Sequence, residues 1–269
     1  MRLASLAMYT YPPPIAAATD LFWAFLRRRL AEEGVADLPE ALDTAVAYDD
    51  AWLRPNLLIA QTCGFPYVKR LRGLVRLVAT PVYDLPGCDG PAICSFVIVR
   101  KDAAASSLQD LRGLRAAINE PGSNTGMNLL RAAIARLAGG TPFFSGVIET
   151  GSHLASIAAV ESGQADTAAI DCVTFGNIGR FEPARLGNIR VIGRTPSGPG
   201  LPFITAASTP DAEVALLRRL LVEATQAPAL ADVCDRLSLR GFDPVSDDGY
   251  DSLARLEQQA VEAGYPRLA

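Results

Sequence analysis

Histidine is nearly absent from this 269-residue sequence, and the motifs of several enzyme classes are missing. The one histidine, His153, excludes a metal site built from several histidines, and no C-x-x-C pair is present for zinc or thioredoxin-type chemistry. There is no phosphate-binding G-x-x-x-x-G-K-[ST] loop, no G-x-G-x-x-G fingerprint and no G-x-S-x-G nucleophile elbow. We therefore expect no metal, no cofactor and no catalytic residue, although a Ser-His-Asp triad with His153 and Asp171 is arithmetically possible.

Basic residues are not in excess, and long apolar runs are missing. The chain has 25 Lys and Arg against 29 Asp and Glu, a net charge of −4, which argues against a nucleic-acid partner. No uncharged apolar run reaches the roughly 18 residues of a membrane span, so we expect no membrane insertion. Met1 to Tyr9 begins like a signal peptide, but Pro12 to Pro14 interrupt it without a clean cleavage site. We predict a first strand there, so the protein either stays in the cytoplasm or its export signal is missing from this sequence.

Five cysteines are present, which is an odd number. Cys88 and Cys94 are close enough in sequence to bridge, but an odd total favours mostly free, buried thiols. Reduced cysteines are typical of a reducing compartment.

Apolar runs and helical periods alternate along the chain, which predicts α/β architecture with parallel sheets covered by helices. Strands are expected near residues 3–10, 45–48, 57–60, 75–80, 93–99, 115–118, 146–149, 167–170, 190–193 and 203–206. Helices are expected from Pro12–Pro14 to Gly34, and near residues 125–138, 152–160, 211–225, 229–237 and 249–263.

Two Pro- and Gly-rich stretches, residues 83–91 and 196–202, flank the middle third of the chain. They predict an outer lobe of residues 1–93 plus 204–269 and an inserted lobe of residues 94–203. Two separate crossings between lobes would form a hinge that closes on a ligand.

Three polar turns fall where ligands bind in α/β proteins, beyond the carboxyl ends of strands. Ser123, Asn124, Thr125 and Gly126 open a helix after one predicted strand, and Ser152 and His153 open the next helix. Helix starts offer backbone N–H groups and a positive dipole end to an anion. Asp171 ends the apolar strand 167–170 and would meet a ligand amine or hydroxyl. The alternatives are plain helix-capping turns, a structural histidine and a capping aspartate.

The segments Asn119–Gly126, Gly151–Val160 and Gly163–Asp171 resemble the phosphonate-binding (phosphate/phosphite/phosphonate) family of ABC-transporter substrate-binding proteins. The resemblance covers nearly the whole chain. It implies a type 2 periplasmic-binding-protein fold, with two α/β lobes joined by two crossing strands and a ligand cleft between them. The missing export signal and the turn Gln61 to Gly64 depart from the family pattern.

The resemblance also implies site residues and partners. Ser123, Asn124, Thr125 and Gly126 would hold an anionic head near Ser152 and His153, with Asp171 at the ligand's other end. The outer lobe would contribute residues near its own strand ends, namely Tyr9, Tyr11, Gln61, Thr62 and Tyr67. The expected partners are a small phosphonate- or phosphate-like anion and an ABC permease, with the chain itself a monomer in the periplasm.

Two other functions share this fold. One is an intracellular ligand-sensing module, which the missing signal favours. The other is an enzyme acting on a small phosphorylated or pyrimidine-like compound, which would need the nucleophile, base or metal that the sequence does not offer.

Overall fold

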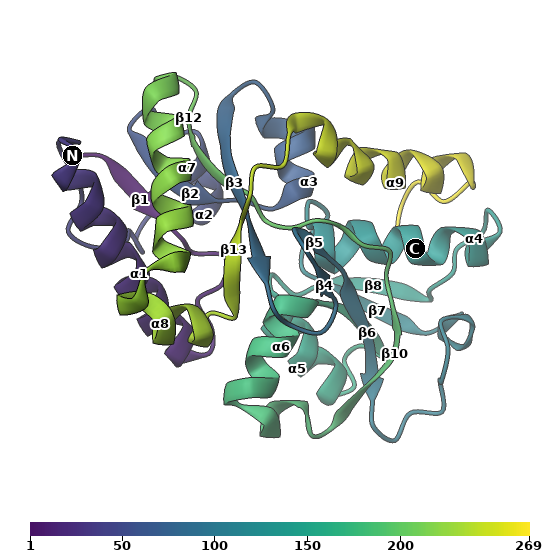
Figure 1. Cartoon of the computed structure of the whole chain (residues 1–269). Coiled ribbons are helices and arrows are strands. Elements are labelled where there is room, and N and C mark those ends of the chain that lie inside the picture. Colours follow the sequence, from purple (N-terminus) through teal and green to yellow (C-terminus); the bar gives the residue numbers. More distant parts are fainter. The chain divides into compact units, whose positions relative to one another are not determined.

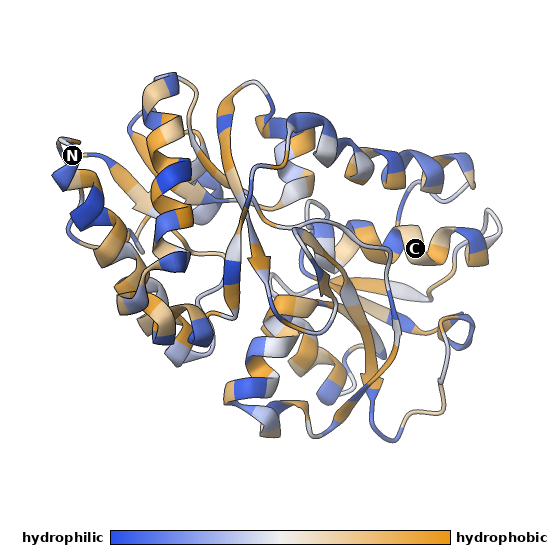
Figure 2. Ribbon diagram, viewed as in Figure 1, coloured by the Kyte–Doolittle hydropathy of each residue, from blue (hydrophilic) through white to orange (hydrophobic).

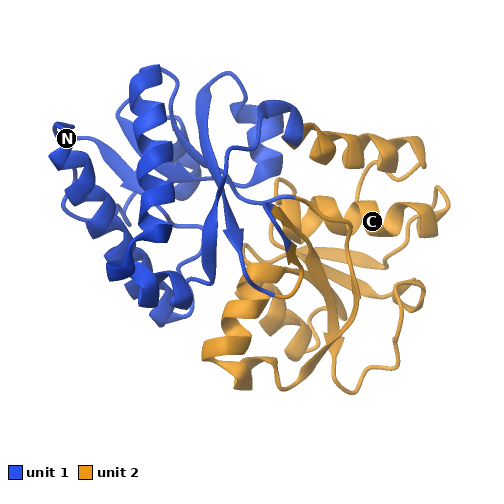
Figure 3. Cartoon of the chain, viewed as in Figure 1, with its two compact units in different colours: residues 1–85, 89–91, 199–249 blue, residues 86–88, 92–198, 250–269 orange.

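The computed structural model describes residues 1–269 and divides them into two compact units (Figures 1 and 3). Unit 1 comprises Met1–Leu85, Asp89–Pro91 and Pro199–Gly249, and unit 2 comprises Pro86–Cys88, Ala92–Gly198 and Tyr250–Ala269. Three short strands lie where the chain passes from one unit to the other: β4 (Cys88–Asp89), β5 (Ala92–Ile93) and β11 (Gly198–Pro199). None of the helices combines the length and hydropathy that a membrane-spanning helix needs.

Unit 1 is built on a mixed five-stranded sheet in the order β1-β2-β12-β3-β13. Its strands are β1 (Leu3–Ser5), β2 (Leu57–Gln61), β12 (Phe203–Ala206), β3 (Val75–Tyr83) and β13 (Leu239–Asp243). β1 and β2 are parallel, whereas β12 runs antiparallel to β2 and β3. The carboxyl ends of β1 and β2 therefore meet at one edge of the sheet.

Three helices of unit 1 share one core with this sheet: α1 (Pro13–Glu32), α7 (Asp211–Gln226) and α8 (Ala231–Arg236). The core is built around fully buried Phe22 and Trp23 of α1, packed with Leu220 and Leu221 of α7. Proline at the start of α1 suits a first helical turn, and Gly34, with φ +83°, follows its end. Unit 1 also contains two short helices, α2 (Tyr48–Trp52) and α3 (Gly64–Pro66). Its remaining helical turns are η1 (Tyr67–Leu71), η5 (Pro228–Leu230) and most of η6 (Asp247–Tyr250).

Unit 2 is built on a second five-stranded sheet, in the order β10-β6-β9-β7-β8. Its strands are β10 (Ile189–Arg194), β6 (Ser95–Arg100), β9 (Thr167–Asp171), β7 (Arg115–Ile118) and β8 (Gly146–Glu149). β9, β7 and β8 are parallel, and β6 runs antiparallel to β9 with Ser95 opposite Asp171. β10 is antiparallel to β6, so one sheet edge gathers the carboxyl ends of β7, β8, β9 and β10 and the beginning of β6.

Helices α4 (Leu129–Ala138) and α9 (Asp251–Glu262) pack against each other over one face of this sheet. Helices α5 (His153–Glu161) and α6 (Cys172–Phe181) contact the sheet strands as well and lie on its other side in Figure 1. The short helical turns of the unit are η2 (Gln109–Leu111), η3 (Asn124–Asn128) and η4 (Pro183–Leu186). Figure 2 shows mostly apolar strands and, on α7 and α9, apolar and polar stretches in alternation, as amphipathic helices require.

The C-terminal segment is grouped differently from the prediction, which placed residues 204–269 together. Residues Tyr250–Ala269 belong to unit 2, so the chain passes from unit 1 to unit 2 once more, after Gly249. The reason is packing: Ala260 and Tyr265 enter the unit 2 core, and the N–H of Phe143 donates to the carbonyl of Ala269.

Several predicted elements need correction. The strand expected at residues 45–48 is wrong, because Asp43 Oδ1 accepts bonds from the N–H groups of Ala45 and Val46 and holds a turn before α2. The first strand ends at Ser5 rather than Thr10, and the strand expected at residues 93–99 is divided at Cys94 into β5 and β6. β13 was not predicted, since its sequence LRGFD lacks an apolar run.

Candidate functional site

The predicted turns of unit 2 do come together at the edge of its sheet. Residues 119–126 follow β7, Ser152 and His153 follow β8, and Asp171 ends β9, all at the carboxyl ends of parallel strands. Ser95, at the start of antiparallel β6, joins them, and its Oγ donates to the Thr125 carbonyl at 2.8 Å. We call residues Ser95, Ser123–Gly126, Ser152, His153 and Asp171 the unit 2 edge cluster.

The turn before α4 is tightly organised. Oγ of Ser123 accepts a bond from the N–H of Gly126 at 3.0 Å, which leaves the Ser123 hydroxyl proton available to a ligand. A Cβ at Gly126 would lie 2.6 Å from Oδ1 of Asn119 and 2.9 Å from Oγ of Ser123, so only glycine fits there. The helix begins here with the irregular turn η3, whose first N–H groups lack partners within the helix.

Asn124 presents a buried donor. Its side chain is fully buried, its Oδ1 accepts from Nδ2 of Asn128 at 3.2 Å, and its own Nδ2 has no hydrogen-bond partner. Asn128 is held in turn by Arg131, whose guanidinium donates to Oδ1 at 2.7 Å and pairs with Glu257 of α9. The network fixes the Asn124 amide so that its N–H₂ group remains a donor, which a buried anion would satisfy.

His153 contacts the neighbouring turn, with Nε2 3.0 Å from Oγ1 of Thr125. Burial lowers the pKa of His153 to about 4, and the backbone of Ala169 offsets only part of this effect, so the ring is neutral at pH 7. A neutral imidazole and a hydroxyl carry two donor protons between them, and their mutual bond uses one. When Nε2 carries the proton and donates to Thr125, the Thr125 hydroxyl proton remains available to a ligand.

Asp171 and Ser152 both cap helices, as the alternative interpretation expected. Oδ1 of Asp171 accepts from the N–H groups of Val173 and Thr174, at 2.8 and 3.1 Å, at the start of α6. Ser152 Oγ accepts from the N–H of Ala155, and its hydroxyl is exposed. Both side chains thus stabilise helix starts at the same sheet edge.

The candidates in unit 1 gather at the carboxyl edge of their own sheet, but most of them have structural partners. Gln61 Nε2 donates to the Leu201 carbonyl at 3.1 Å, and the fully buried Thr62 donates its N–H to the Pro202 carbonyl. The hydroxyl of buried Tyr67 bonds to Asp247, and burial together with this bond raises the Tyr67 pKa.

Tyr9 and Tyr11 remain half-buried near this edge, with the Tyr9 ring edge-on to Tyr83 at 5.8 Å. Their rings are therefore the more accessible of the unit 1 candidates.

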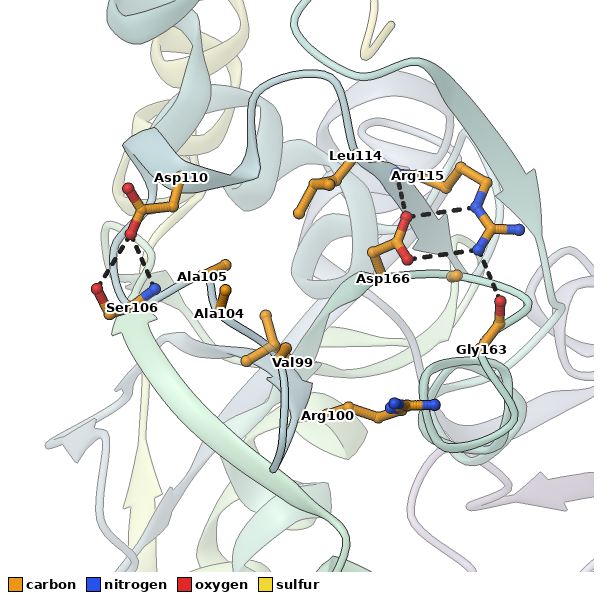
Figure 4. Close-up of a pocket in the computed structure, with 12 residues that line it drawn as sticks. Val99, Arg100, Ala104, Ala105, Ser106, Asp110, Leu114, Arg115, Gly163 and Asp166 are labelled. Carbon is orange, nitrogen blue, oxygen red and sulfur yellow. Dashed lines mark hydrogen bonds and ion pairs between the residues drawn. The ribbon is translucent and has the colours of Figure 1, made fainter.

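A separate cavity lies at the opposite edge of the unit 2 sheet (Figure 4). Its volume is about 880 Å³, and none of the predicted site residues lines it. Its arginines are already paired, Arg115 with Asp166 at 3.3 Å and Arg100 with Asp102 at 2.6 Å. The unit 2 edge cluster, by contrast, offers donors without internal partners.

Sequence reasoning missed Ser95, Asn119 and Asn128 as members or supports of this cluster. Ser95 carried a signal, because it is the one polar residue inside an otherwise apolar run. No group of three or more His, Cys, Asp or Glu side chains is placed to hold a metal ion.

Comparison with known proteins agrees with this architecture. A binding protein component of an ABC phosphonate transporter from Pseudomonas aeruginosa superposes with a TM-score of 0.76 at 18% identity, covering 98% of this chain and 87% of that one. PhnD1 from Prochlorococcus marinus, in complex with methylphosphonate, superposes with a TM-score of 0.74 at 14% identity, covering 97% of this chain and 98% of that one. XAC2383 from Xanthomonas citri, bound to chloride ion, superposes with a TM-score of 0.71 at 18% identity, covering 98% of each chain.

A comparison with curated protein sequences gives no match. A family model does match, and it covers residues 48–250, most of the chain. The protein therefore belongs to the family described as ABC transporter, phosphonate, periplasmic substrate-binding protein.

Proposed function

We propose that this protein is the solute-binding component of an ABC importer and that the unit 2 edge cluster binds the anionic group of its ligand. One observation carries the proposal: hydroxyl and amide donors of the turn after β7 and the imidazole of the turn after β8 converge at one sheet edge, without internal partners for all their protons. Charge-assisted hydrogen bonds from such donors are strong, because the acceptor is ionised.

The donor set favours a compact tetrahedral oxyanion. No lysine or arginine belongs to the cluster, and His153 is neutral at pH 7, so recognition rests on hydrogen bonds and helix dipoles. Phosphonate, phosphate or phosphite offers three or more acceptor oxygens to such donors. Asp171 supplies a carboxylate at the same edge, where an amine on the ligand would pair with it.

Binding without turnover is the second part of the proposal. The cluster has no metal-ligand set, and no carboxylate bonds to Nδ1 of His153 to orient the ring as a general base beside Thr125. The family supports the further proposal that the protein delivers its ligand to a permease on the outer side of the cytoplasmic membrane, and we propose that it acts there as a monomer.

Titration calorimetry tests the proposal with methylphosphonate, 2-aminoethylphosphonate, phosphate, phosphite, sulfate and a neutral isostere. We expect measurable heat only with anions, and weaker binding after Ser123→Ala, each lost donor costing about 0.5–3 kcal/mol. Ser145→Ala is the matched control, because this exposed serine precedes β8 at the opposite sheet edge. Equal binding of the neutral compound, unaffected by Ser123→Ala, would show that the cluster is not an anion site.

A further inference from the structure

Three of the five cysteines lie together in unit 2. The Sγ atoms of Cys88 and Cys172 are 3.5 Å apart, and the thiol of Cys94 also bonds to that of Cys172. The N–H of Cys172 donates to the carbonyl of Cys94 at 3.0 Å. All three are free thiols. A small side-chain rotation would bring the Sγ atoms of Cys88 and Cys172 from 3.5 Å to the disulfide bond length of about 2 Å.

The backbone at Gly87 is shaped around this thiol cluster. A Cβ at that position would lie 2.8 Å from Cβ of Cys172 and 3.0 Å from Sγ of Cys94. Gly87 also has φ +94°, in the left-handed region that favours glycine. The cysteines are therefore packed against one another by the fold and are not neighbours by sequence alone.

The three thiols differ in access. Cys88 is half-buried, whereas Cys94 and Cys172 are buried. Hydrogen bonding to the neighbouring thiol and burial raise the pKa of both buried cysteines, which slows their reaction with external reagents. An external disulfide thus reaches Cys88 first, and Cys172 reacts only with a sulfur already beside it.

We propose that Cys88 and Cys172 are the site of a reversible disulfide, formed by exchange with an external disulfide such as oxidised glutathione. In the first step the Cys88 thiolate attacks the external disulfide, whose S–S bond breaks and releases one thiol. In the second step Cys172 loses its proton and attacks Sγ of Cys88, releasing the second thiol. Two electrons and two protons pass from the protein to the external disulfide, which becomes two thiols.

The bond would join the start of α6 to the segment Pro86–Cys88 of unit 2. Cys172 directly follows Asp171, which caps α6. Cys88 ends the short segment Pro86–Cys88, which lies in the sequence between two stretches of unit 1. The two cysteines are 84 positions apart, so the cross-link restricts a long loop in the unfolded chain. We expect it to raise the thermal midpoint by about 10 °C.

Peptide mapping of the full chain tests this inference. The protein is incubated with oxidised glutathione, its remaining thiols are alkylated, and it is cleaved after Lys and Arg and before Asp. We expect two of the five thiols to be lost and one linked pair of fragments, Asp84–Cys88 with Asp171–Arg180. Cleavage before Asp89 separates Cys88 from Cys94, so the two pairings are distinguishable.

Matched variants complete the test. Cys88→Ser removes the most accessible of the three thiols and should abolish the linked fragments, whereas Cys94→Ser and Cys234→Ser should preserve them. If Cys172→Ala does not fold, the Cys88→Ser result still decides. A chain that keeps five thiols, holds glutathione at Cys88 without closing, or links Asp89–Arg100 to Asp171–Arg180 would overturn the inference.

Discussion

Oγ1 of Thr125 lies 3.0 Å from Nε2 of His153, so the turn after β7 is hydrogen-bonded to the first turn of α5. These two residues are 28 positions apart and are joined because β7 and β8 are adjacent parallel strands. The pair therefore links two of the turns that we propose as the anion site.

Thr125→Val should weaken anion binding by about 1–3 kcal/mol, because valine keeps the shape but removes the hydroxyl and its bond to His153. Titration calorimetry with methylphosphonate measures the change. Thr141→Val is the control, since its hydroxyl bonds only to the Ala138 carbonyl at the other end of α4. Equal losses in both variants would contradict a specific role for Thr125.

Acidification should destabilise the protein through His153. Its folded-state pKa of about 4 lies below the unfolded value of 6.5, so the unfolded chain binds the proton more readily between these pH values. The contribution is fully present above pH 6.5 and lost as the pH falls toward 4, at most about 3 kcal/mol. Urea unfolding of wild type and His153→Gln across this range should show a steeper loss in the wild type. Parallel curves would mean that the histidine is not buried in the neutral form.

Gly126→Ala should distort the turn before α4, because the new Cβ would lie 2.6 Å from Oδ1 of Asn119. We expect a loss of about 1–3 kcal/mol in unfolding free energy, with weaker anion binding. Gly146→Ala is the matched control, since no atom lies within 4 Å of a Cβ there and its φ is ordinary. A stable, fully binding Gly126→Ala protein would show that the turn tolerates a side chain.

Tyr265→Ala should destabilise unit 2, because this buried ring packs in the core beneath α4 and α9. We expect a loss of about 3–5 kcal/mol, as for other large-to-small core changes. Hydrogen exchange should accelerate in β7 and α4 while β2 and β3 of unit 1 keep their protection. Val261→Ala, at a position that is 48% exposed, should change little. Faster exchange confined to unit 1 would instead support the predicted grouping of residues 204–269.

Much of the fold was predictable because its signals are local. The strands Arg115–Ile118, Gly146–Glu149 and Phe203–Ala206 match the structure residue for residue, since each is a short run bounded by turn residues. Ser152 was predicted to start a helix, and its side chain does cap α5. A serine followed by a helical period specifies that start without help from distant residues.

The sequence by itself determined which turns carry polar groups at strand ends, because strand and helix periods are read along the chain. Only the tertiary structure decided which groups meet. Antiparallel pairing of β6 with β9 brings Ser95 opposite Asp171, and packing of Tyr265 assigns the last helix to unit 2. The tertiary structure also pairs Gln61 with Leu201 and Tyr67 with Asp247. It places Cys88 beside Cys172. Such contacts depend on strand order and side-chain packing between segments far apart in the chain, which no local pattern encodes.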